Sequence, residues 1–147
     1  MTRSERMKPV QQVVRANEQR EAGQLVVSEE RLAACEGKLA ELKQYEQDYR
    51  DAFNTRVAAG IGGSGLRDYQ VFLARLAEAI RQQTKLVATA RNERDAQQSH
   101  WQEAARRHKA IDHVVDGWQT EERRHAERRE QRDSDERAQR APRARLD

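Results

Sequence analysis

The sequence predicts an all-α protein: an antiparallel two-helix coiled-coil hairpin with a longer, overhanging C-terminal helix. Four of the seven glycines lie between Gly60 and Gly65, and each glycine disfavours a helix by about 1 kcal/mol relative to alanine. The long segments on either side carry apolar residues at alternating spacings of three and four. Charged residues make up 36% of the chain, which suits paired helices with narrow apolar seams better than a thick globular core.

Composition also restricts the function. The 28 basic and 25 acidic residues nearly balance, which is not typical of a nucleic-acid-binding protein. No apolar run approaches 18 residues, so we expect no transmembrane helix and no direct membrane insertion. The start of the sequence lacks the apolar core of a signal peptide, and the single Cys35 excludes an internal disulfide. We therefore expect a reduced, cytoplasmic setting and a single coiled-coil domain over residues 1–147.

The first helix is expected over residues 10–57. Pro9 is acceptable in the first turn of a helix, and no proline follows until after the glycine cluster. Seven of nine seam positions are apolar from Leu25 onward, and the seam is less regular before that residue. The nine positions are Leu25, Ser28, Leu32, Cys35, Leu39, Leu42, Glu46, Tyr49 and Phe53.

The glycine-rich turn is expected over residues 58–65. Its hexapeptide from Gly60 to Gly65 fits G-x-G-x-x-G, the pattern of a dinucleotide-binding loop. That site requires a β-strand immediately before the motif, and the charged residues before this one have no strand character. No Lys-Ser/Thr pair follows, so a phosphate-binding loop is excluded as well. A helix reversal is the better interpretation.

The second helix is expected over residues 66–138, with Asp68 near its start, where negative charge suits the helix dipole. Eleven of its fifteen seam positions are apolar, without a change of register. They are Tyr69, Leu73, Leu76, Ile80, Gln83, Val87, Ala90, Arg94, Gln97, Trp101, Ala104, His108, Ile111, Val115 and Trp118.

The seam ends at Trp118. Residues 119–147 contain nine arginines and eight acidic residues, and we expect residues 139–147 to be a frayed charged tail. The first helix would be roughly 70 Å long and the second roughly 110 Å. Folding about the glycines would pair residues whose numbers sum to about 123, so everything after about Val115 would overhang.

Nothing in the sequence indicates an enzyme. The four histidines do not stand at metal-ligand spacing with cysteines or carboxylates, and no serine or cysteine has a plausible base. We expect no catalytic residue, no cofactor and no metal. The histidines are His100, His108, His113 and His125.

One flank of the predicted seam is apolar near the turn. In heptad terms, Tyr45 and Ala52 occupy g positions of the first helix, and Phe72, Ala79 and Leu86 occupy those of the second. Because g faces g in an antiparallel pair, Ala52 should oppose Phe72, and Tyr45 should oppose Ala79. The other flank is mostly polar, with Glu36, Lys43, Arg50, Gln70, Ala77 and Thr84. An apolar flank with two aromatic residues indicates a docking surface, or a seam that is merely wider.

Several of these residues, in this order and spacing, resemble the flagellar export protein FliJ family over about residues 40–140. The matching residues are Leu42-x-x-Tyr45-x-x-x-Tyr49, the glycine turn, Tyr69-x-x-Phe72-Leu73-x-x-Leu76-x-x-Ala79-Ile80-x-x-Gln83, Trp101, and Gln131-x-x-x-Asp135-Glu136. Arg132 stands where the family motif often has a lysine.

The resemblance implies a cytoplasmic component of the flagellar type III export apparatus, peripherally associated with the inner membrane at the flagellar base. Such proteins are similar to the γ stalk of rotary ATPases and enter the ring of the export ATPase hexamer. They also bind the export-gate membrane protein, and some escort chaperones of late substrates. The gate contact would map onto Tyr45, Tyr49, Phe72, Leu76 and Ala79. The late motif, Gln131, Asp135 and Glu136, would lie at the ATPase end.

Two other classes share parts of this pattern. A structural coiled-coil spacer would have the same seam and would not need the apolar flank. A basic nucleic-acid adaptor would use the arginines after Trp118, but interleaved acidic residues cancel most of their field. These arginines are Arg123, Arg124, Arg128 and Arg129.

Overall fold

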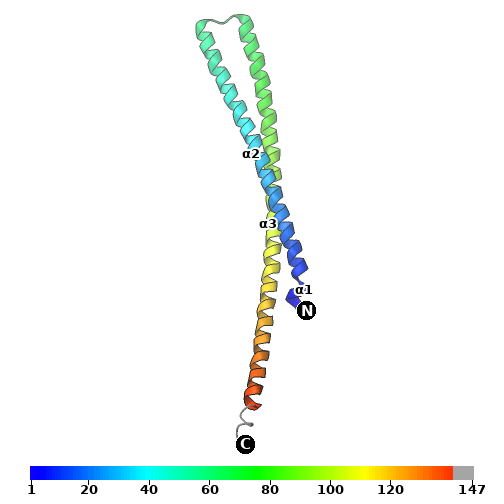
Figure 1. Ribbon diagram of the computed structural model, residues 1–147. Helices are drawn as coiled ribbons and strands as arrows, with labels where there is room; N and C mark the ends of the chain where they lie inside the picture. Colours follow the sequence, from blue (N-terminus) through cyan, green and yellow to red (C-terminus); the bar gives the residue numbers. More distant parts are fainter. Residues whose placement is uncertain (141–147) are drawn as a thin grey trace. The chain divides into compact units, whose positions relative to one another are not determined.

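A computed structural model of the chain describes residues 1–140. They form three helices, α1 (Arg3–Arg6), α2 (Lys8–Ala59) and α3 (Gly63–Arg140), as Figure 1 shows. No strand occurs within residues 1–140, so the predicted all-α class is confirmed. None of these helices is both long enough and apolar enough to cross a lipid bilayer.

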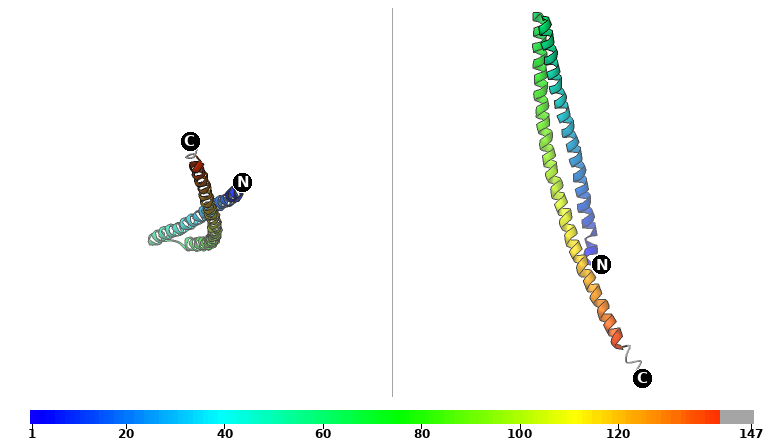
Figure 2. Two further views of the ribbon diagram at one scale, coloured as in Figure 1. Left: turned by 90° about the horizontal axis from the view of Figure 1, so that it is seen from below. Right: turned by 90° about the vertical axis from the view of Figure 1, so that its left-hand side faces the viewer.

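The chain divides into two compact units, and each contains an antiparallel pair of segments from α2 and α3. The turn unit comprises Glu21–Trp101 and includes the helix reversal. The terminal unit comprises Met1–Arg20 together with the residues from Gln102 onward. In the right-hand view of Figure 2, the α2 and α3 segments of the turn unit lie side by side, as a helical hairpin requires.

The break between the helices covers only residues 60–62 and is shorter than the expected turn of 58–65. Gly60 has a positive φ of 92°, a conformation that glycine adopts readily at the end of a helix. Gly65 is already helical, and a Cβ there would lie 2.7 Å from Ile61 Cγ1. The glycines therefore allow close packing inside the first turn of α3, and they lower helix propensity without forbidding the helix.

The turn unit has the predicted apolar seam. Every predicted seam position within it is buried or half-buried. Leu32, Val87 and Ala90 form its core, with Cys35 and Leu39 packed against them. The seam is thus confirmed across both helices of this unit.

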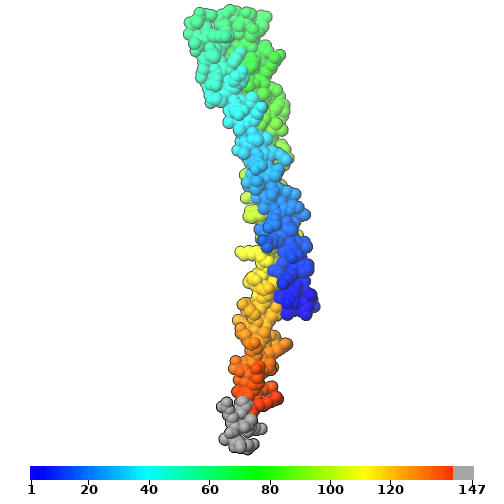
Figure 3. Space-filling view, viewed as in Figure 1, coloured from blue at the N-terminus to red at the C-terminus, as the bar shows by residue number. Residues whose placement is uncertain are grey.

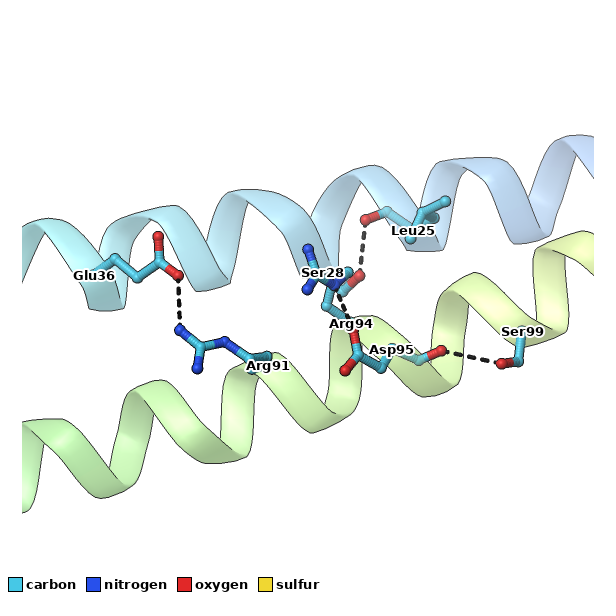
Figure 4. Close-up of polar contacts among 7 residues, drawn as sticks. All are labelled: Leu25, Ser28, Glu36, Arg91, Arg94, Asp95 and Ser99. Atoms are coloured by element: carbon cyan, nitrogen blue, oxygen red, sulfur yellow. Dashed lines mark hydrogen bonds and ion pairs between the residues drawn. The ribbon is translucent and has the colours of Figure 1, made fainter.

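Polar contacts between the helices fix the heptad register of the turn unit. Arg31 Nη1 lies 3.2 Å from Glu93 Oε2, and both residues occupy g positions. On the opposite flank, Arg91 Nη2 lies 3.5 Å from Glu36 Oε1, as Figure 4 shows. Because each ion pair joins equivalent flanks of the two helices, g faces g as predicted.

The terminal unit pairs further along α3 than expected. The N-terminal residues lie against the part of α3 that belongs to the terminal unit, as the space-filling view of Figure 3 shows. Val115 is 1% exposed, and Arg3 covers the ring of Trp118 at 4.2 Å. Ser4 donates hydrogen bonds to Glu122 from its amide and its hydroxyl. The expectation that everything after about Val115 overhangs is therefore wrong, because α1, which precedes the expected start of the first helix at residue 10, covers this stretch.

Beyond Glu122, α3 has no covered face within the described chain. Every residue from Arg123 to Arg140 is exposed, in agreement with the loss of the apolar seam after Trp118. The helix reaches Arg140, two residues beyond the expected end. Of the charged tail expected at 139–147, Gln139 and Arg140 are helical, and residues 141–147 lie outside the described part.

Candidate partner-binding surface

Five aromatic side chains meet next to the glycine turn. Tyr45, Tyr49 and Phe53 come from the last turns of α2, and Tyr69 and Phe72 come from the first turns of α3. Phe53 stacks on Tyr69 with ring centroids 3.5 Å apart. Tyr49 stacks on Tyr69 at 5.5 Å and lies 4.2 Å from Phe72. We call these five residues the aromatic cluster; it joins the two helices where they leave the turn.

Phe72 is the residue that connects this cluster to the apolar flank. Its ring meets Tyr45 edge-on at 5.8 Å, with the ring planes at 79°. The predicted pairs of Phe72 with Ala52 and of Tyr45 with Ala79 have the same g-to-g register as the observed pair of Arg31 and Glu93. Phe72 is half-buried, and its ring reaches Tyr45, which lies one heptad from Ala52 on α2.

The remaining predicted gate residues differ in accessibility. Leu76 is only 6% exposed and belongs to the core of the seam, so its side chain supports the surface from beneath. Ala79 is half-buried, whereas Tyr45 is 53% exposed and Leu86 is 55% exposed. The accessible apolar surface therefore consists of Tyr45, Phe72, Ala79 and Leu86, which we call the apolar edge.

The apolar edge is local to the turn. Further from the turn, the same flank is closed by the ion pair between Arg31 and Glu93. Glu78 lies next to Ala79 of the apolar edge. The pKa of its carboxyl is lowered mainly by a hydrogen bond from Gln82, with a smaller effect from the hydrogen bond of Arg81. An uncharged strip is thus bordered by a carboxylate that stays ionised at neutral pH.

A shallow hollow of about 240 Å³ lies beside the aromatic cluster. Phe53, Ile61 and Tyr69 line it, with Arg56 and Asp68 at its sides. Ile61 belongs to the turn, so the turn adds an apolar side chain to the surface next to the aromatic cluster.

The late motif lies elsewhere in the fold. Gln131, Asp135 and Glu136 are all exposed on α3 and belong to the terminal unit. Gln131 and Asp135 are four residues apart and so share one face of the helix. No group of three or more His, Cys, Asp or Glu side chains within residues 1–140 is arranged to hold a metal ion.

Two members of the aromatic cluster were missing from the predicted site. Phe53 and Tyr69 were assigned only to the seam, although they make the closest ring stack in the cluster. The signal was available in the sequence, because both are aromatic seam residues within three turns of the glycines. Aromatic pairs stabilise each other beyond the area they bury, so they hold the helix ends together under the apolar edge.

The comparison with known families decides the identity. A family described as flagellar FliJ protein matches residues 3–146, nearly the whole chain. The chain belongs to the FliJ family. Searches of curated proteins and of solved structures gave no significant match. As a FliJ-family protein, the chain is a component of the flagellar protein export apparatus.

Proposed function

We propose that this FliJ-family chain is a cytoplasmic coiled-coil stalk that connects two parts of the export apparatus. Its turn unit binds the export-gate membrane protein, and its terminal unit binds the ring of the export ATPase. It also escorts chaperones of late export substrates. These contacts bring it to the inner membrane at the flagellar base without inserting it.

The observation that carries the gate contact is the apolar edge. A two-helix coiled coil normally has charged residues on its flanks, and this chain follows that rule at Arg31–Glu93 and Glu36–Arg91. Between the Arg31–Glu93 pair and the turn, the g flank exposes an aromatic and a leucine side chain, Tyr45 and Leu86. Exposed aromatic residues are favoured at the centres of protein interfaces, which supports a docking role for this edge.

The ATPase contact is supported by the exposed end of α3. Residues 123–140 form a helix whose residues are all exposed, and it carries the late motif of Gln131, Asp135 and Glu136. Its alternating charges give it a solvated surface with many ion-pairing groups. Such a surface suits a polar binding partner better than an apolar groove.

The gate contact is tested by titrating the purified gate protein and the export ATPase separately against variants of the full chain. Phe72→Ala should weaken gate binding by more than about 1 kcal/mol, as for an interface hot spot, and leave ATPase binding nearly unchanged. Tyr45→Ala serves as the second variant, because its exposed ring contributes less to the fold.

The matched control is Gln70→Ala, an exposed polar position of α3 on the opposite flank. It should change binding to neither partner. Circular dichroism is recorded for every variant, because Phe72 also packs on Tyr49. If both Phe72→Ala and Tyr45→Ala keep their helicity and bind the gate like the parent, the edge is only a wider seam and the chain is better described as a spacer.

A further inference from the structure

The seam line of α3 continues beyond the residues that α1 covers. Arg3 lies over the ring of Trp118, and Ser4 donates two hydrogen bonds to Glu122, the next position of the line. Seam positions recur after alternating steps of three and four residues, so the line continues through His125, Arg129 and Arg132. All three side chains are exposed. The apolar seam is thus followed by basic residues on the same line, and we call these three residues the basic line.

The charges of this stretch alternate along the sequence but separate on the surface of the helix. With about 3.6 residues per turn, Arg124 and Arg128 fall beside the basic line, and the five side chains occupy a sector of about 140°. The acidic residues between positions 123 and 134 all lie outside this sector. They are Glu127, Glu130 and Asp133. These carboxylates therefore flank the basic line and do not interrupt it.

A hollow marks the place where α1 begins and the basic line follows on α3. Its volume is about 480 Å³, and Arg6, His125 and Arg129 are among the residues that line it. The two glutamates in its wall already contact α1 through an ion pair and a pair of hydrogen bonds. The charge of these glutamates is thus matched by α1, and the surplus charge of the hollow is positive.

We propose that the basic line and this hollow dock a short acidic segment of a partner protein, which continues the line of α1 along α3. The inference rests on the proposed function, in which the exposed end of α3 contacts the export ATPase. It adds the chemistry of that contact, because it places carboxylates on the ATPase side. Guanidinium groups bind carboxylates through paired, charge-assisted hydrogen bonds, which are stronger than hydrogen bonds between neutral groups.

The length of the basic line limits the class of partner. From His125 to Arg132 the helix rises by about 10 Å, a distance spanned by about two turns of a helix or about three extended residues. Asp135 and Glu136 follow within the same sector of α3 and end the run of basic residues. A nucleic acid carries a phosphate at every nucleotide and would extend over these two carboxylates, which repel it. A short acidic protein segment avoids them.

The proposal is tested with two variants of equal net charge in the full chain. Arg129→Gln/Arg132→Gln removes two charges from the basic line, and Arg123→Gln/Arg137→Gln removes two charges from outside its sector. All four side chains are exposed, so both variants should keep the helicity of the parent, which circular dichroism checks. The purified export ATPase is titrated against both variants and the parent.

The basic-line variant should bind the ATPase at least about tenfold more weakly than the parent, because it loses two charge-assisted contacts. The variant outside the sector should bind within about twofold of the parent, since exposed charges away from the contact are screened. Added salt should weaken binding of the parent more than binding of the basic-line variant.

Each other outcome counts against the proposal in a different way. If the parent binds and the two variants bind equally, the acidic segment is refuted while the ATPase contact stands. If the parent itself does not bind the ATPase, the proposed contact is refuted and this inference with it. A short DNA duplex is titrated in parallel. If binding of the duplex depends on Arg129 and Arg132 and binding of the ATPase does not, the basic line is a nucleic-acid site and the proposal is wrong.

Discussion

The hydroxyl of Ser4 donates a 2.6 Å hydrogen bond to Glu122 Oε2, while the Ser4 amide donates one of 3.1 Å to Oε1. These two bonds, the hydroxyl bond first, hold the pKa of the Glu122 carboxyl below its ordinary value. Because the ionised form is favoured in the folded state, its contribution is present at neutral pH and is lost as the pH falls through the lowered pKa.

We therefore expect the amide-proton chemical shift of Ser4 to titrate in acid, with a midpoint below that of an ordinary glutamate. Glu122→Gln should remove this titration and weaken protection of α1. Glu121→Gln is the matched control, because Glu121 pairs with the exposed Arg3 guanidinium and should leave the Ser4 titration in place. An unchanged Ser4 shift across the acid range would contradict the assigned bonds.

Truncating the buried leucine of the apolar seam should destabilise the turn unit. Leu76→Ala removes a side chain that is 6% exposed, and we expect a loss of roughly 2–5 kcal/mol, at the lower end because only two helices surround the site. Leu86→Ala, at a position that is 55% exposed, should change stability by less than about 0.5 kcal/mol. Chemical denaturation of both variants checks this, and equal midpoints would mean that Leu76 is not core.

Two glycines of this region should respond in opposite directions to alanine. Gly37 lies within α2, and a Cβ there would meet nothing within 4 Å, so Gly37→Ala should stabilise the helix by about 0.5–1 kcal/mol. Gly60 has a φ of 92°, so Gly60→Ala should cost about 1–2 kcal/mol. Thermal melting of the two variants tests both expectations. A melting temperature of Gly60→Ala at or above that of the parent would contradict the positive φ assigned to Gly60.

The exposed end of α3 should exchange its amide protons fast in the free chain. Residues 123–140 have no packed face, and an unpaired helix of this length is only marginally stable in water. If this end binds the export ATPase, its exchange should slow in the complex. Strong protection of this segment in the isolated chain would be evidence against an unpaired helix.

The apolar seam could be predicted from the sequence because its signal is periodic and long. Leu76, Val87 and Ala104 are buried where the heptad places them, and the charged flanks pair as that register requires. Hydrophobic periodicity reports which face of a helix is covered, and this information is local to each helix.

The pairing of the terminal unit could not be predicted in the same way, because its contacts are polar. Gln11 and Glu18 occupy seam positions and are covered by hydrogen-bonding partners on α3, so they leave no apolar pattern. The contacts of α1 depend on a helix only four residues long, which periodicity cannot detect. The contacts of the aromatic cluster were missed for a third reason: rings such as those of Tyr45 and Phe72 meet across one heptad, and heptad positions alone do not specify such contacts.

The three-residue turn also sets the order in which the contacts between the helices should form during folding. Contacts next to it close short loops, as between Phe53 and Tyr69, whereas Gln83 meets Cys35 across 48 positions and Arg3 meets Glu121 across 118. Loop closure costs more entropy as the loop lengthens, unless a pairing nearer the turn has already shortened it. The two helices should therefore pair first next to the glycines and then progressively further from them. The N-terminal segment, although it is synthesised first, should pair last during folding and separate first during unfolding.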